Sequence, residues 1–103
     1  MEKLQRHFQD QLDVLSEKLL VMGGLVEETI GRTVSALVNR DSELARSVIV
    51  DDEKVDRFDL EIDQIGMEIL GLHQPVARDL RFVITAMKVT NDLERIADLC
   101  TNV

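Results

Sequence analysis

Apolar residues recur at spacings of three and four along the first third of the chain. This spacing is that of an amphipathic helix, which turns one stripe of side chains toward a core. It predicts a helix from about Glu2 to Val38. Gly23, Gly24 and Gly31 lie inside it. Because each interior glycine costs about 1 kcal/mol relative to alanine, they predict either close approach of a neighbouring helix or a kink near Gly23. The apolar stripe consists of Leu4, Phe8, Leu12, Leu15, Leu19, Met22, Val26, Ile30, Thr33 and Leu37.

Two further helices are predicted, from about Ser42 to Leu70 and from Val76 to the end of the chain. Asp41 or Ser42 is a candidate N-cap of the second helix. Pro75 breaks the second helix and suits the first turn of the third. Short turns favour antiparallel packing, so the sequence predicts one all-α domain over residues 1–103, an elongated three-helix bundle. The second helix has an apolar stripe interrupted only at Asp51, which consists of Leu44, Val48, Val55, Phe58, Ile62, Ile65, Ile69 and Leu72.

The composition fits one globular domain, because 45% of the 103 residues are apolar. The 20 acidic residues outnumber the 12 basic ones, and the resulting net charge of −8 speaks against a nucleic-acid partner. No apolar run approaches the roughly 20 residues that span a bilayer, and the N-terminus lacks the apolar core of a signal peptide. We therefore expect a soluble, cytoplasmic protein. Its single cysteine, Cys100, cannot form an internal disulfide and is predicted to be a small buried apolar residue.

The third predicted helix changes character along its length. Leu80, Ile84 and Met87 form one stripe at about 100° per residue. Polar residues continue this stripe, namely Asn91, Glu94, Asp98 and Asn102. An apolar face lies roughly opposite and consists of Val89, Leu93, Ile96, Cys100 and Val103. The last turns therefore present two carboxylates and two amides on a side that the core does not need.

The second predicted helix carries an acidic stripe of its own, formed by Asp52, Asp56, Asp59 and Asp63. Counting outward from the turn between the two helices places Asp52 near the level of Arg95. Antiparallel packing therefore sets the pair Asp52 and Asp56 beside the acidic pair of the third helix. Clustered carboxylates are costly unless a cation neutralises them, and oxygen ligands suit Mg²⁺, Ca²⁺, Mn²⁺ or iron. The alternative is a solvated acidic face that Arg95 partly neutralises.

Neither histidine indicates an enzyme. Carboxylate-bridged di-iron oxidases need Glu-x-x-His pairs, whereas Leu4 stands three residues before His7 and Leu70 three residues before His73. The chain has no Ser–His or Cys–His arrangement and no phosphate-cradling glycine loop. We expect His7 to be exposed and His73 to be a surface or cap residue. The sequence thus predicts a protein that binds partners rather than one that catalyses a reaction.

The segment from Asp51 to Asn102 resembles the PhoU family of phosphate-signalling proteins, in particular one of its two homologous three-helix repeats. The resemblance rests on DDEKVDRFDLEI, on QPVARDLR at the turn and on TNDLERIADLCTN, and it covers most of the chain. It implies Asp/Glu-x-x-x-Asp motifs that hold metal ions, iron first, with Mn, Zn, Mg or Ca as alternatives. Carried over to this sequence, the metal ligands are Asp52, Asp56, Glu94 and Asp98, with Asn91 and Asn102 as candidate auxiliary ligands.

The resemblance also implies a function, that of a negative regulator linking the ATPase of a phosphate transporter to a sensor histidine kinase. One repeat stands where the family has two. We therefore expect an uncovered apolar flank and self-association that mimics the missing half. The alternative is a helical scaffold or oligomerisation module without a specific metal site, whose acidic stripes only maintain solubility.

Overall fold

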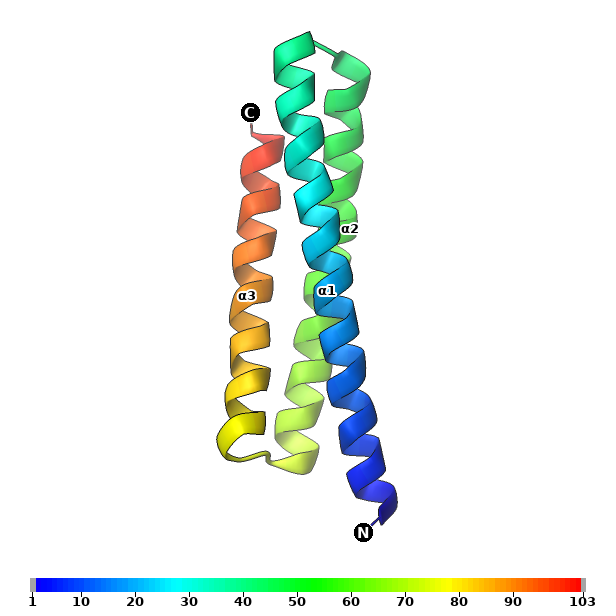
Figure 1. The fold of residues 1–103 in the computed structure, drawn as a ribbon, viewed down its shortest axis with the longest axis vertical. Coiled ribbons are helices and arrows are strands. Elements are labelled where there is room, and N and C mark those ends of the chain that lie inside the picture. Colours follow the sequence, from blue (N-terminus) through cyan, green and yellow to red (C-terminus); the bar gives the residue numbers. More distant parts are fainter. Residues whose placement is uncertain (1, 103) are drawn as a thin grey trace.

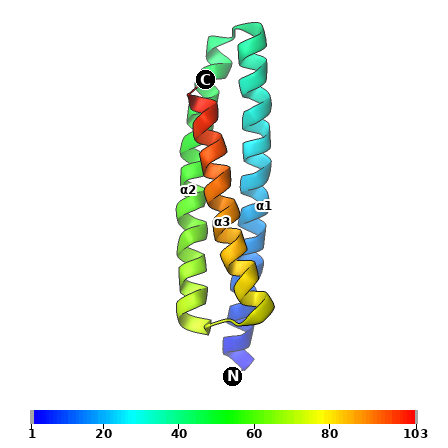
Figure 2. The ribbon, with the colours of Figure 1, turned by 90° about the vertical axis from the view of Figure 1, so that its left-hand side faces the viewer.

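Three long helices form the architecture of the described residues (Figure 1). The computed structural model describes residues 2–102, in which α1 spans Glu2–Asn39, α2 spans Ser42–His73 and α3 spans Ala77–Thr101. The helices run up, down and up again, and the bundle measures 57 × 20 × 16 Å. The view turned by 90° shows α3 lying along both other helices (Figure 2). The predicted all-α, elongated three-helix bundle is therefore confirmed.

The turn between α1 and α2 is fixed by a side-chain cap. The carboxylate of Asp41 accepts hydrogen bonds from the backbone N–H groups of Glu43 and Leu44, each at 3.1 Å. These bonds satisfy two of the N–H groups that a helix start leaves without a partner. Asp41 rather than Ser42 is thus the N-cap of α2.

The loop between α2 and α3 differs from the prediction at both ends. α2 continues three residues beyond the predicted end at Leu70. Pro75 restricts the backbone of the residue before it, Gln74, and that residue leaves the helix with φ 45°. Pro75 lies in the loop and not in the first turn of α3, which begins at Ala77. At the other end α3 closes at Thr101, and the predicted final residue, Val103, lies outside the described residues.

One aliphatic core runs along the bundle axis. All three helices contribute to it, and the side chains of Leu15, Met22 and Ile62 are fully buried. No helix within residues 2–102 is both long and apolar enough to cross a membrane. The buried apolar core residues are Leu12, Leu15, Met22, Val26, Val55, Ile62, Ile69, Val83, Ala86 and Ala97.

The buried line of α1 departs from the predicted stripe in its second half. Ile30 and Leu37 are 41% and 55% exposed, whereas Thr29 and Ala36 are buried. A straight seam between packed helices needs alternating steps of three and four, and two consecutive steps of four turn the stripe away from the partner. The core takes the step from Val26 to Thr29 instead. The hydroxyl of Thr29 is satisfied there because it donates to the carbonyl of residue 25 at 2.8 Å.

The same correction applies to α3. The predicted apolar face is not its core side, since Val89 and Ile96 are each 38% exposed and Cys100 is only half-buried. The buried line lies between the apolar face and the acidic stripe, and consists of Val83, Ala86, Thr90 and Ala97. Its residues follow each other at steps of three, four and seven, and three of the four are alanine or threonine. Small side chains admit the neighbouring helices closely, which a search for large apolar residues does not reveal.

The glycines of α1 do not mark a helix contact. An added Cβ atom at Gly23, Gly24 or Gly31 would meet nothing within 4 Å, so the predicted close approach is wrong there. α1 runs through all three as one helix. Close approach occurs instead at Gly66 of α2, where a Cβ atom would lie 2.7 Å from the sulfur of Met87. This contact holds α3 against α2 between their connecting loop and the acidic residues Asp56 and Glu94.

Asp51, which interrupts the apolar stripe of α2, is buried in a contact with α1. Its carboxylate accepts from the guanidinium of Arg32, and Lys54 approaches it at 3.9 Å. Arg32 also reaches Glu28 at 3.3 Å. A buried carboxylate without a partner is strongly destabilising, so this ion pair accounts for a charge in the seam between α1 and α2.

Replacing Arg32 by methionine keeps most of the aliphatic stem and leaves the buried Asp51 carboxylate without its main partner. We expect the free energy of unfolding to fall by about 3 kcal/mol, measured by urea denaturation. Glu28→Gln removes only an exposed pair on the same helix and should cost less than about 0.5 kcal/mol. Equal losses in the two variants would contradict a structural role of the Arg32–Asp51 pair.

Candidate metal centre

Three carboxylates from two helices converge on one point of the α2–α3 interface. Asp52, Asp56 and Asp98 each offer an oxygen atom, and these oxygens all lie within 4.8 Å of one another. Glu94, one turn before Asp98, is a charged neighbour of both Asp98 and Asp56. Of the four residues named as ligands from the sequence, three therefore converge and the fourth, Glu94, lies beside them. We call these four residues the acidic cluster.

The register between the helices differs by about one turn from the prediction. Asp52 lies beside Asp98 and not near the level of Arg95, because α2 runs on to His73 before the chain reverses. Arg95 is exposed. Within residues 2–102 no ion pair joins it to the acidic cluster, so the neutralisation considered from the sequence is absent from this part of the chain.

The surroundings of the acidic cluster favour protonated carboxyls. Burial, followed by the adjacent carboxyl of Asp98 and the negative charge of Asp56, raises the pKa of Asp52 from 3.8 to about 6. Burial and then the same two neighbours raise the pKa of Glu94 from 4.5 to about 7. Further along α2, burial and the charges of Asp63 and Asp56 raise the pKa of Asp59. Negative charge in this region is thus costly without a counter-charge.

One oxygen of the acidic cluster has no partner. The Oδ1 atom of Asp52 is buried and makes no hydrogen bond to the described residues. Buried polar atoms in folded proteins are nearly always satisfied, and an exception requires a physical explanation. A cation between the carboxylates would satisfy this oxygen and neutralise its neighbours, so the residues present fit a metal ion.

Other sequence candidates lie outside this constellation. Asp59 and Asp63 continue the acidic stripe along α2 but are not among the three converging carboxylates. Asn91 and Asn102 are both exposed. Sequence reasoning missed the pairing of Asp51 with Arg32, although the interruption of an apolar stripe by a carboxylate is a signal for a buried partner.

The donor set defines the chemistry open to the site. It consists of carboxylate oxygens alone, with no thiolate or imidazole among the converging groups. Such ligands select hard cations over those that favour sulfur or nitrogen. Because the ligands come from two helices, a bound ion would also join α2 to α3. The fold and the cluster thus define a helical bundle with an acidic site between two helices.

Comparisons with known proteins agree with this class. Residues 19–103 match the family model of the PhoU domain. Proteins named as phosphate-specific transport system accessory protein PhoU homologues are similar to the chain: one from Zymomonas mobilis is 38% identical over 93% of this chain and 40% of its own length. One from Pseudomonas putida is 39% identical over 97% of this chain and 39% of its own length. One from Thermotoga maritima is 34% identical over 94% of this chain and 42% of its own length.

The chain belongs to the PhoU family, since the family model matches most of its length. It spans about two fifths of the length of the curated relatives it matches. The resemblance deduced from the motifs around the two acidic pairs is therefore confirmed at the level of the family.

The raised pKa values predict an unusual dependence of stability on pH. The folded state holds the protons of Asp52 and Glu94 more tightly than the unfolded chain does. In metal-free buffer the stability they confer is therefore present at about pH 4 and is lost as the pH rises to about 7. We expect this component in urea denaturation as a difference between the chain and its Glu94→Gln/Asp98→Asn variant. Parallel pH profiles of the two proteins would contradict it.

Proposed function

We propose that the chain is a cytoplasmic accessory regulator of phosphate transport that acts by binding and not by turnover. Its membership of the PhoU family supports this role, because the similar proteins carry names that describe transport-system accessory proteins. Neither His7 nor His73 stands in the Glu-x-x-His pattern of a di-iron oxidase. The module then changes the activity of a partner through the surface that it presents.

The second part of the proposal is that the acidic cluster holds a metal ion. The observation that carries it is the convergence of Asp52, Asp56 and Asp98 within 4.8 Å around a buried oxygen that lacks a partner. Iron is the first candidate, and Mn, Zn, Mg or Ca are alternatives. The ion would supply the positive charge that four neighbouring carboxyls need, and it would fix the separation of α2 and α3.

The proposed partners are the ATPase of a phosphate transporter and a sensor histidine kinase. The cluster is suited to affect such contacts, because Asp56 is exposed while Asp52 and Asp98 are half-buried. The chain has a net charge of −8, and a cation bound at the acidic cluster would make the surface around the cluster less negative. We expect the affinity for the purified transporter ATPase, measured by calorimetry, to differ between the metal-loaded chain and the chain stripped with a chelator.

Metal retention tests the site directly. The chain is incubated with Fe, Mn, Zn or Mg salts and desalted, and its metal content is measured by elemental analysis. We expect metal to be retained in a fixed ratio to protein and to be lost from Glu94→Gln/Asp98→Asn. Charge-neutral, nearly isosteric substitutions also relieve the repulsion, so this variant should remain folded by circular dichroism.

A matched control is available on α2, in the acidic stripe that also contains Asp52 and Asp56. Asp59→Asn/Asp63→Asn removes two negative charges of α2 outside the converging carboxylates and should retain the metal. If this control and the Glu94/Asp98 variant lose metal equally, binding reflects net charge alone. No retained metal in any of the three proteins would favour the alternative, a helical scaffold whose acidic residues maintain solubility.

We also propose that the chain forms homo-oligomers. Phe82, Val89 and Ile96 repeat every seven residues along α3 and leave between 36% and 38% of their surface exposed, and Leu99 extends the row at 59%. A row of this kind on one helix is an oligomerisation surface when a second copy covers it. Light scattering should give a mass above that of the monomer, which Ile96→Lys reduces to the monomer. A monomeric mass of the unaltered chain at tens of micromolar would contradict this.

A further inference from the structure

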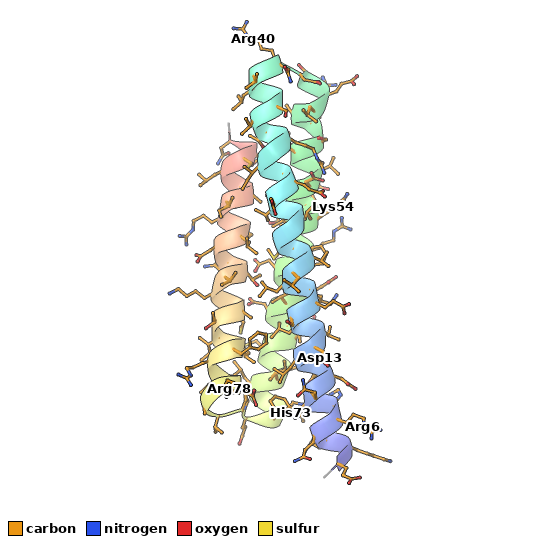
Figure 3. All side chains as sticks on the ribbon, in the orientation of Figure 1. Arg6, Asp13, Arg40, Lys54, His73 and Arg78 are labelled. Atoms are coloured by element: carbon orange, nitrogen blue, oxygen red, sulfur yellow. The ribbon has the colours of Figure 1, made fainter. Side chains whose placement is uncertain are left out.

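The two histidines meet where the first turns of α1 pass the last turn of α2. The ring centres of His7 and His73 are 5.5 Å apart, with the planes tilted by 52°. Phe8 packs against His73 with a centroid distance of 4.8 Å. In Figure 3 His73 lies at the lower end of the bundle, beside the N-terminal part of α1. This site is at the C-terminal end of α2, whereas Asp52 and Asp56 of the acidic cluster lie well inside that helix.

Hydrogen bonds from His73 through Gln11 to Glu68 indicate which ring nitrogen of His73 carries the proton and which has an available electron pair. The amide nitrogen of Gln11 donates to a carboxylate oxygen of Glu68 at 3.3 Å, so its amide oxygen must face the other way. That oxygen lies 2.9 Å from Nε2 of His73. Because a carbonyl oxygen only accepts, Nε2 carries the proton and Nδ1 of the neutral ring carries the free electron pair. An imidazole held in this manner by a second group is the usual arrangement of a metal-binding histidine.

The separation of the rings fits a shared ion. A tetrahedral Zn²⁺ about 2.1 Å from one nitrogen of each imidazole places the two ring centres roughly 5 Å apart. The observed 5.5 Å is close to this value without a movement of either helix. Asp10 follows one turn after His7, and both line a shallow hollow beside Gln11 that His73 does not line.

We propose that His7 and His73 form a second cation site, selective for ions that prefer nitrogen ligands, such as Zn²⁺. The acidic cluster offers oxygen ligands alone, so the two sites differ in the kind of ion they take. An ion bound here joins the first turns of α1 to the end of α2. The sequence favours a surface or cap residue over a ligand at His73, and two observations support the ligand role: the neighbouring imidazole of His7 and the hydrogen bond to Gln11.

Zn²⁺ itself is the probe, and the Glu94→Gln/Asp98→Asn chain is the background, which keeps zinc out of the acidic cluster. Titration calorimetry gives stoichiometry and affinity, and two-dimensional NMR follows the carbon-bound protons of both imidazoles. We expect one Zn²⁺ per chain, with the signals of both rings changing together. His7→Gln and His73→Gln should each weaken binding at least tenfold, and Gln11→Met, which frees the tautomer, should weaken it to a smaller extent.

Two results would overturn the site. One is an affinity for Zn²⁺ that neither single histidine substitution changes. The other is a titration in which only one of the two imidazoles responds. Circular dichroism of each variant shows whether it is folded, and because His7 is exposed, His7→Gln tests the site without disturbing the core. The outcome is separate from that of the acidic cluster, because each histidine variant is compared with a parent chain in which Glu94 and Asp98 are already replaced.

Discussion

The short connection between α2 and α3 is the constraint on which the candidate site depends. Only Gln74–Val76 separate the two helices, so each level of α2 has a fixed opposite level on α3. Asp52 and Asp98 lie at equal distances along the chain from this loop, and the contact of Gly66 with Met87 holds the helices together between loop and cluster. An insertion of one residue would rotate one set of carboxylates by about 100° and disperse the site.

Two neighbouring aspartates of α2 show how differently the fold treats a charge. Asp51 points toward α1 and is paired with Arg32, whereas Asp52, the next residue, faces α3 and has a buried oxygen without a partner. Both carboxylates are at least partly removed from water and carry a desolvation cost. The first cost is compensated within the chain. The second is left to a proton or to a cation from outside, which is the physical reason for treating one as structural and the other as part of a binding site.

The helices, their antiparallel order and the four carboxylates could be predicted because each depends on local spacing. The details that could not be predicted depend on packing between helices. Thr29, Thr90 and Ala97 are buried in preference to larger apolar residues nearby, since small side chains fit where three helices meet and spacing alone does not reveal the exact rotation of a helix. The partner of Asp51 and the encounter of His7 with His73 join residues distant in sequence. A single sequence can indicate that a residue such as Asp51 needs a partner, but it does not indicate which distant residue supplies it.

The order of the helices also bears on how the chain folds. α1 and α2 are connected by two residues and α2 and α3 by three, so two of the three interfaces form between segments that are adjacent in the chain. Such local topologies have low contact order and fold in roughly microseconds to milliseconds. The packing of α1 against α3 is the only interface that no single loop closes. It should therefore be the last to consolidate, after either helical hairpin has formed.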